Sequence, residues 1–186
     1  MNEILNTIKT RFSCRDYTGA PVESNKLEAL VKAALQAPSA LNLQPWELIV
    51  IKNKSLIDKL NDAALQNLKA NDDKTAYNRI MERGGKVYYN APCMILVLKA
   101  PDSAPRSDLD CGILVQNIAL AASSLCLGSV IAAMTEIPFT GEAGAEYRKS
   151  VGWKDGYTYG IGILVGYVNS GKDPHEINLS KVSYVD

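Results

Sequence analysis

The chain has very little of what side-chain catalysis usually requires, beginning with histidine. His175 is the single histidine among 186 residues, and neither a second histidine nor an acidic cluster accompanies it. A hydrolase with a serine or cysteine nucleophile needs a histidine base, and a metal centre needs several ligands close together. We therefore expect neither kind of hydrolase site and no metal centre.

Glycine-rich phosphate loops and paired carboxylates are missing as well. There is no GxGxxG or Walker pattern, because Gly160 and Gly162 lie late in an apolar run that no helix follows. No pair of carboxylates stands out for glycoside chemistry. Together with the shortage of histidine, these absences favour a bound organic cofactor that carries the reactivity itself.

The sequence also lacks an excess of either charge, a long apolar run and paired cysteines. The 20 Lys and Arg residues balance 20 Asp and Glu residues, which argues against nucleic acid as the main partner. No run of about 18 apolar residues occurs, and residues 1–5 lack a signal-peptide pattern, so we expect no membrane partner. The scattered cysteines favour buried thiols in a reducing cytoplasm. These cysteines are Cys14, Cys93, Cys111 and Cys126.

What the sequence does contain is an alternation of helical and strand-like apolar patterns over the length of one domain. We expect Ser24 to be the N-cap of the second helix. The alternation predicts an α+β or α/β domain, with helices on both faces of a sheet of four or five strands. The predicted helices cover residues 3–10, 22–37, 55–70, 75–83, 108–127 and 140–150, and the predicted strands cover 47–52, 92–99, 129–134 and 157–168, with 182–185 as a candidate fifth strand.

A polar segment near the N-terminus has groups suited to a ligand. Arg11, Ser13 and Arg15 alternate along the chain, so in extended backbone their side chains point the same way. Two guanidinium groups beside a hydroxyl suit a phosphate or an electron-rich ring edge. The alternative is a solvated turn in which Arg15 pairs with a nearby acid.

A second polar segment, residues 38–46, lies between the second helix and the first strand. We call it the 38–46 loop. Its small residues and two prolines cannot extend the helix before it. Ser39, Asn42 and Gln44 can donate to and accept from a heteroaromatic edge, whereas the alternative is a purely structural loop.

These segments belong to a longer series of ordered motifs. The series is Arg11-x-Ser13-x-Arg15, Ala37-Pro38-Ser39-Ala40-x-Asn42-x-Gln44-Pro45-Trp46, Asn90-Ala91-Pro92, Asp110 and Asn117 on an alanine-rich helix, Leu127-Gly128, and a late Gly-Ile-Leu-Val-Gly-Tyr run at 162–167. Together they resemble the FMN-dependent nitroreductase family over essentially the whole chain, as a compact member. The resemblance implies a three-layer α+β fold with a mostly antiparallel sheet of four to five strands. It also implies an intertwined homodimer, with residues 1–168 as the FMN-binding domain and residues 169–186 as a tail exchanged with the partner.

The same resemblance implies a role for each motif at an FMN site between subunits. Arg11 and Ser13 would address the phosphate side of FMN, and Arg15 the pyrimidine edge of the ring. The 38–46 loop would reach the flavin of the partner chain, and the strand after Leu127-Gly128 would present backbone near the flavin N5 atom. The cofactor-binding residues expected beyond Arg11, Ser13 and Arg15 are therefore Pro38, Ser39, Ala40, Asn42 and Gln44 from the loop, Ala132, Ala133 and Met134 after the strand, and Lys172 and His175 in the tail.

The chain departs from the family pattern at two places. Lys172 and His175 stand where family tails commonly carry arginines, and the segment after Gly128 lacks the Trp and Gly found there in many compact members. Lys86 is a candidate for the mid-chain polar contact to FMN that many relatives have. These departures bear on phosphate binding and on ring packing.

The activity implied by the resemblance is that of an NAD(P)H oxidoreductase. NADH or NADPH would deliver hydride to flavin N5, and a nitroaromatic, quinone or related small acceptor would then take the electrons in the same pocket. No side chain would act as an obligatory catalytic acid, although Arg15 would tune the flavin. The alternatives are a specialised flavoreductase such as a dehalogenase or enone reductase, a non-catalytic FMN-binding sensor or storage protein, and an α+β binding protein without cofactor.

Overall fold

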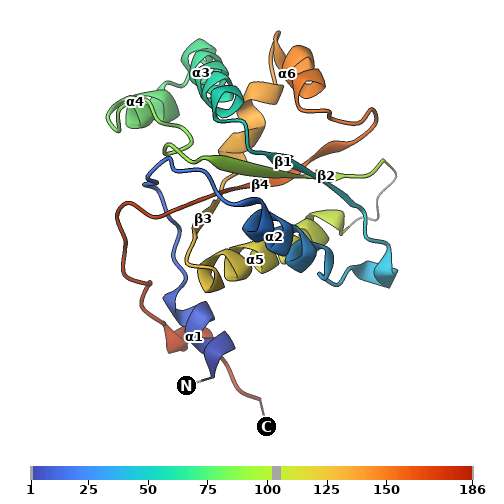
Figure 1. Ribbon diagram of the computed structural model, residues 1–186, viewed down its shortest axis with the longest axis vertical. Coiled ribbons are helices and arrows are strands. Elements are labelled where there is room, and N and C mark those ends of the chain that lie inside the picture. Colours follow the sequence, from blue (N-terminus) through green and yellow to red (C-terminus); the bar gives the residue numbers. More distant parts are fainter. Residues whose placement is uncertain (1, 102–105, 186) are drawn as a thin grey trace.

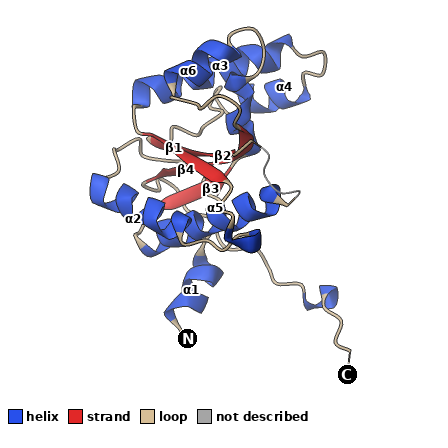
Figure 2. Ribbon diagram, turned by 90° about the vertical axis from the view of Figure 1, so that its right-hand side faces the viewer, coloured by secondary structure: helices blue, strands red, loops and turns tan. Residues whose placement is uncertain are grey.

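The computed structural model describes residues 2–101 and 106–185, and it has three layers. A four-stranded antiparallel sheet lies between two layers of helices (Figure 2). Its strand order is β1-β2-β4-β3. The strands are β1 (Trp46–Ile51), β2 (Cys93–Lys99), β3 (Gly128–Ile131) and β4 (Thr158–Gly166). This architecture confirms the predicted α+β class and the antiparallel sheet.

The two faces of the sheet are covered by different helices (Figure 1). On one face lie α2 (Ser24–Leu35) and α5 (Ser107–Ser124). The opposite layer contains α3 (Lys54–Ala70), α4 (Thr75–Met81), α6 (Gly144–Ser150) and a short 3-10 helix, η2 (Ala133–Phe139). Helix α1 (Glu3–Thr10) lies outside these layers and buries no residue of its own.

The core consists of two apolar clusters, one on each side of the sheet. Six of the seven residues of β2 are buried, because this strand pairs on both edges and is covered on both faces. Helix α5 is apolar nearly all round because it packs against α2, β3 and β4. The predicted central buried helix and fully buried strand are therefore confirmed.

Gly162 in β4 fixes the position of η2 against the sheet. A side chain at Gly162 would clash with Thr135 of η2. The amide of Ala132 donates to the Gly162 carbonyl over 2.9 Å, and the Thr135 hydroxyl donates to the Ala132 carbonyl over 2.9 Å. The chain therefore leaves β3 at Ile131 and turns at once into η2, which is why the strand predicted over 129–134 ends three residues early.

Two further predictions from the sequence are wrong. Ser24 is the first residue of α2, and the N-cap is Glu23, whose carboxylate accepts from the Tyr167 hydroxyl over 2.7 and 2.8 Å. That link to the end of β4 holds Glu23 outside the helix. Residues 182–185 form no strand, because the tail runs away from the sheet beyond α1 and meets no strand to pair with (Figures 1 and 2).

None of the helices in residues 2–101 and 106–185 combines the length and the apolar character that crossing a bilayer would need.

Candidate functional site

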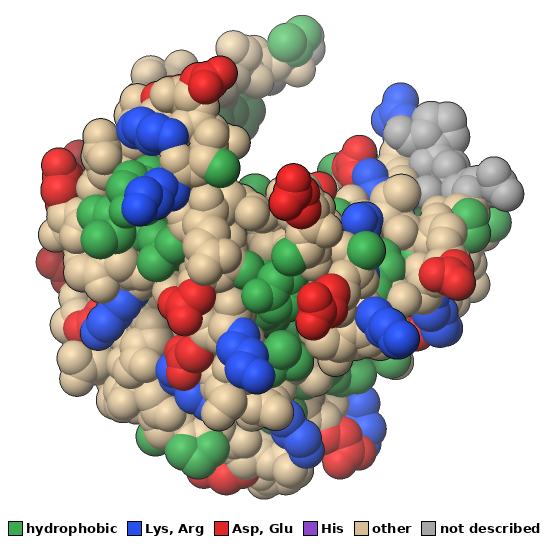
Figure 3. Space-filling view, turned by 90° about the horizontal axis from the view of Figure 1, so that it is seen from above, with side chains coloured by type: hydrophobic (Ala, Val, Ile, Leu, Met, Phe, Trp, Pro, Cys, Tyr) green, Lys and Arg blue, Asp and Glu red, His purple; other side chains and the backbone are tan. Residues whose placement is uncertain are grey.

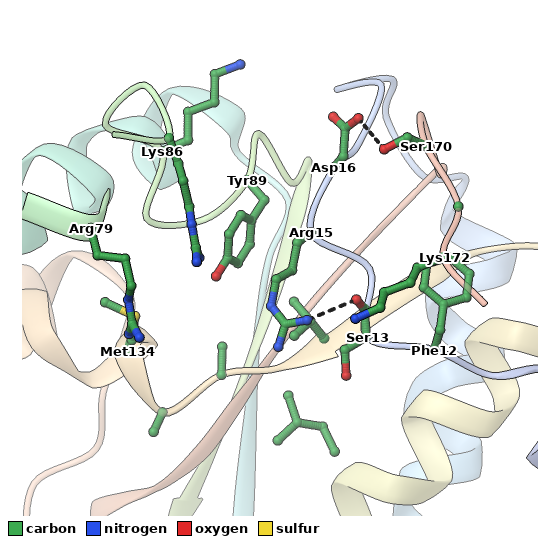
Figure 4. Close-up of a pocket in the computed structure, with 16 residues that line it drawn as sticks. Phe12, Ser13, Arg15, Asp16, Arg79, Lys86, Tyr89, Met134, Ser170 and Lys172 are labelled. Carbon is green, nitrogen blue, oxygen red and sulfur yellow. Dashed lines mark hydrogen bonds between the residues drawn. The ribbon is translucent and has the colours of Figure 1, made fainter. Parts of the chain in front are cut away.

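A cavity of about 760 Å³ opens beside β3, on the edge of the sheet. Its volume is within the range of about 300–1,000 Å³ that is typical of small-molecule sites. Four stretches of chain that are far apart in sequence line it (Figure 4). The lining residues are Phe12, Ser13, Arg15 and Asp16; Arg79, Arg83, Lys86 and Tyr89; Val130, Ile131, Ala132, Ala133 and Met134; and Ser170, Gly171 and Lys172.

The first stretch reaches the cavity because it runs alongside β3. The amide of Cys14 donates to the Ser129 carbonyl over 2.9 Å, and Ser13 forms an isolated parallel bridge with Ser129. Cys14 is fully buried, so its neighbours Ser13 and Arg15 face the other way, into the cavity. The predicted alternation of Ser13 and Arg15 is thus present in the structure.

Arg11 lies apart from this cavity. It is the C-cap of α1, where its amide donates to the Thr7 carbonyl over 3.0 Å, and it is not among the lining residues. Alternation along the segment gave no warning of this, since the backbone at Arg11 is itself extended, with φ of −60° and ψ of 133°.

Asp16 anchors the tail to the cavity wall. Its carboxylate accepts from the Ser170 hydroxyl over 2.7 Å and from the Asn169 side chain over 3.0 Å. These hydrogen bonds, with a smaller contribution from the charge of Lys86, hold the pKa of the Asp16 carboxyl below its ordinary value. Lys172 consequently lies beside Ser13 at one side of the cavity (Figure 4). His175 is exposed and does not line it.

The segment between β3 and η2 offers backbone donors. Ala132 and Ala133 carry minimal side chains, and the amides of Ala133 and Met134 make no hydrogen bond within the described chain. The first amides of a helix have no partner inside it and are available to a ligand. This wall can therefore donate to the edge of a planar ring.

The electrostatic character of the cavity is strongly positive. Among the described lining residues Asp16 is the single carboxylate, and its Oδ2 already accepts two hydrogen bonds from the tail. Within the described residues none of the lining cations forms an ion pair, although Arg15 donates to the Ser13 carbonyl over 3.4 Å. The lining cations are Arg15, Arg79, Arg83, Lys86 and Lys172. This set suits a ligand with a phosphate and an electron-rich ring.

Two of these cations, Arg79 and Arg83, were not anticipated from the sequence. Their spacing of four residues near the end of a predicted short helix was the available signal. It became meaningful only once α4 was placed beside the cavity. Tyr89 was also missed; it enters the lining through a left-handed backbone at Tyr89 and Asn90, with φ of 53° and 63°.

The 38–46 loop lies at the other end of the sheet from the 13–17 segment (Figure 1). The loop contains a short 3-10 helix, η1 (Ala40–Asn42), and is organised by its own polar groups. The Ala40 amide donates to Oδ1 of Asp110 over 3.2 Å, the Gln44 amide donates to the Ser39 hydroxyl over 2.9 Å, and the Gln44 side chain donates to that of Asn42 over 3.0 Å.

A single chain therefore brings only part of the predicted site together. Ser13, Arg15, Lys172 and the residues after β3 share one cavity. The predicted loop residues Pro38, Ser39, Ala40, Asn42 and Gln44 do not line it. Within one chain, the loop residues and the cavity residues therefore form two separate groups.

Comparison with known proteins identifies the relatives of this chain. The model of the nitroreductase family matches residues 8–167. A crystal structure of a nitroreductase with bound FMN from Desulfitobacterium hafniense DCB-2 has 42% sequence identity and a TM-score of 0.95, with 100% of each chain covered.

Two curated proteins are similar over a shorter length. One from Archaeoglobus fulgidus, whose name joins NADH dehydrogenase and NAD(P)H nitroreductase, is 33% identical over 70% of this chain and 67% of its own length. An NADH dehydrogenase from Thermus thermophilus is 30% identical over 85% of this chain and 62% of its own length. The chain thus spans about two thirds or less of these two relatives.

Proposed function

The chain belongs to the nitroreductase family, and on this basis we propose that it is an FMN-dependent NAD(P)H oxidoreductase that reduces nitroaromatic, quinone or related small acceptors. The observation that carries the proposal is the cavity beside β3. It combines unpaired cations with free backbone amides in a volume suited to a small molecule. The family resemblance inferred from the ordered motifs is confirmed by the family match.

The residues that line the cavity fit FMN. Ser13 and Lys172 lie together at one side, where a hydroxyl and an ammonium can hold a phosphate (Figure 4). Arg15 lies in the middle, and its guanidinium can hold the pyrimidine edge of the ring. The amides of Ala133 and Met134 can donate to ring atoms from the β3 wall.

The chemistry that FMN supplies when bound is acceptance of hydride from NAD(P)H, followed by transfer of the electrons to an acceptor. The protein's own groups bind and orient. Arg15 would stabilise negative charge toward the pyrimidine edge of a bound flavin, because its guanidinium is a positioned cation. Ala132 and Ala133 keep the wall free of bulk, so both reactants can approach the same face in turn.

We propose further that the active form is a homodimer in which the 38–46 loop of one subunit completes the cavity of the other. Large apolar side chains are exposed on the loop, on α1 and in the tail, and a monomer in water gains nothing from such exposure. Leu41 is 92% exposed and Val185 is 95% exposed. The other exposed apolar residues in these segments are Ile4, Leu5, Ile8, Leu43, Ile177, Leu179, Val182 and Tyr184. The tail, including His175, would lie against the partner subunit in this arrangement.

The cysteines agree with a reducing setting, and we propose the cytoplasm. Cys14, Cys93 and Cys111 are buried and unpaired. Burial raises the pKa of Cys93 to about 12 and that of Cys111 to about 11, so both remain protonated and unreactive near neutral pH.

Absorption spectroscopy tests the proposed activity. The purified protein should be yellow or become yellow when FMN is added. Anaerobic NADH or NADPH should bleach the flavin band, and a quinone or nitroaromatic should restore it. Protein that takes up no FMN, or a bound flavin that neither NADH nor NADPH reduces, would contradict the proposal.

A further inference from the structure

The α4 side of the cavity carries two arginines to which the proposed flavin site gives no role. Arg79 lies within α4 and Arg83 lies two residues beyond its end, and both line the cavity. They are four residues apart. Like charges at this spacing destabilise an isolated helix by about 0.2–0.5 kcal/mol, so local helix stability does not account for the pair.

Neither arginine is neutralised by its surroundings. In the described part of the chain, no acidic side chain forms an ion pair with Arg79 or Arg83. The adjacent Glu82 does not line the cavity, and Asp16 is held by the tail. The outer face over α3, α4 and α6 shows basic and acidic side chains interspersed (Figure 3). The accumulation of one sign of charge is therefore a property of the cavity.

Arg79 lies away from the end of the cavity that suits a phosphate of FMN (Figure 4). Arg79 and Met134 lie on one side of Arg15, whereas Ser13 and Lys172 lie on the other (Figure 4). A volume of about 760 Å³ is in the upper part of the usual range for a ligand site of about 300–1,000 Å³. The α4 side therefore suits a second small molecule placed next to the ring.

Helix α4 is anchored well enough to hold charges in place. Ile80 is 6% exposed and belongs to the core. The Asn61 side chain accepts from the Val87 amide over 2.8 Å and donates to the Gly85 carbonyl over 3.2 Å. These contacts fix the chain on both sides of the turn that carries Arg83.

We propose that Arg79 and Arg83 bind the anionic group of the electron acceptor, so that acceptors with a carboxylate, sulfonate or phosphate are preferred over neutral ones. Guanidinium groups match the planar oxygens of such groups and form charge-assisted hydrogen bonds with them. This inference rests on the proposed function, whose substrate class it narrows. A phosphate of NADPH offers the same chemistry, so the experiment separates the donor from the acceptor.

The test is a stopped-flow measurement of the oxidative half-reaction. FMN-loaded protein is reduced anaerobically with NADH and then mixed with 4-nitrobenzoate or with the neutral 4-nitrobenzamide. In the unmodified protein the rate constant should be higher for the benzoate and should fall as salt is added. In the double variant Arg79→Gln/Arg83→Gln it should fall about tenfold for the benzoate, which corresponds to about 1.4 kcal/mol, and change little for the benzamide.

The matched control is Arg148→Gln/Lys149→Gln on α6. It removes the same charge from two exposed side chains outside the cavity. This control should leave the ratio of the two rate constants unchanged. Circular dichroism and FMN content of each variant establish that folding and flavin loading are intact before the rates are compared.

Three outcomes would overturn the inference. The unmodified protein could show no preference for the benzoate, the double variant could slow both acceptors equally, or the control could have the same effect as the double variant. The double variant could also lose a preference of the unmodified protein for NADPH over NADH in the reductive half-reaction, while its acceptor rates stay unchanged. That result would assign the arginines to the donor and would overturn the inference as well. Failure to take up FMN or to be reduced by NADH is seen before any acceptor is added, and that result would sink the proposed function instead.

Discussion

The two halves of the proposed site, the 13–17 segment (the first half) and the 38–46 loop (the second half), are held in place by different contacts. The 13–17 segment is held against its own sheet. Cys14 is fully buried, and its amide donates a hydrogen bond to the Ser129 carbonyl. The 38–46 loop is mostly exposed, and it is held by one hydrogen bond to Asp110 and by hydrogen bonds among its own residues. Three non-glycine residues of the loop have a left-handed backbone. They are Leu41, Asn42 and Gln44, with φ of 53°, 55° and 47°.

This difference indicates where each half obtains its geometry. The first half takes its shape from the core of its own subunit, so it should be ordered before any ligand or partner binds. The second half stores backbone strain of about 1–2 kcal/mol per left-handed residue and has little core to hold it. We therefore expect the first half to determine FMN chemistry and the second to determine retention of FMN in the dimer.

The largest expected effect concerns Arg15. Replacement Arg15→Ala should weaken binding of reduced FMN by about 1.5–3 kcal/mol, because a charge-assisted contact to the ring is lost. The flavin potential should fall, and Arg15→Lys should recover part of the loss. Potentiometry with a reference dye measures both variants, and an unchanged potential in Arg15→Ala would remove the role assigned to this residue.

A slightly smaller effect is expected where the first half meets the core. A Cβ at Gly128 would lie 2.7 Å from Val168 and 2.8 Å from the Cβ of Cys14. Gly128→Ala should lower the free energy of unfolding by about 1–3 kcal/mol, because overpacking displaces the 13–17 segment. Urea denaturation gives the value.

Gly112→Ala in α5 is the matched control, since a Cβ there meets nothing within 4 Å. It should leave stability unchanged or raise it by up to about 1 kcal/mol through better helix propensity. Equal stability of the two alanine variants would contradict the tight contact between β3 and the 13–17 segment.

The 38–46 loop should be loosened by replacement of Asp110. This residue is 4% exposed, and its Oδ1 accepts from the Ala40 amide, whereas its Oδ2 has no partner in the described structure. Asp110→Ala should lower the free energy of unfolding by about 0.5–1.5 kcal/mol, because the hydrogen bond to the Ala40 amide is lost. It should speed FMN release while leaving the flavin potential unchanged.

Asp110→Asn keeps an oxygen acceptor for Ala40 and should retain FMN nearly as well as the parent protein. Dialysis followed by absorbance at the flavin band measures retention. A shift in the flavin potential of Asp110→Ala would show that the two halves are not separable in this way.

The smallest expected effect is the pH dependence of the tail contact. The pKa of Asp16 is lowered in the folded chain, so its bonds to Ser170 and Asn169 contribute stability above the ordinary carboxyl pKa of 3.8. That contribution is lost as the pH falls through the lower folded value. The melting temperature of the parent protein should therefore exceed that of Ser170→Ala at pH 6, and the gap should close below pH 3.8. A gap of constant size down to pH 3 would contradict the assignment.

The sequence predicted the elements whose pattern is regular and failed where tertiary contacts decide. Apolar spacing located α3 and β2 to within a residue, because burial imposes the periodicity directly. The alternation of Ser13 and Arg15 was likewise predictable, since one buried cysteine sets both directions. Ser24 was misplaced because a contact with Tyr167, far away in sequence, holds Glu23 outside the helix.

The cavity itself was only partly predictable. Arg79, Arg83 and Tyr89 line the cavity because α4 and the turn after it are placed beside it. No local sequence pattern specifies that placement. The predicted strand at 182–185 failed because an apolar run specifies burial and not the partner that buries it. Its exposed side chains and those of the 38–46 loop are accounted for by the same proposal, a second copy of the chain.

Native mass spectrometry of the FMN-loaded protein tests that proposal most directly. We predict a complex of two chains that carries one FMN per chain, and we predict that Asp110→Ala yields a dimer that carries less FMN. A single chain that retains FMN, or a dimer of the unmodified protein that binds none, would contradict a flavin site completed by the partner subunit.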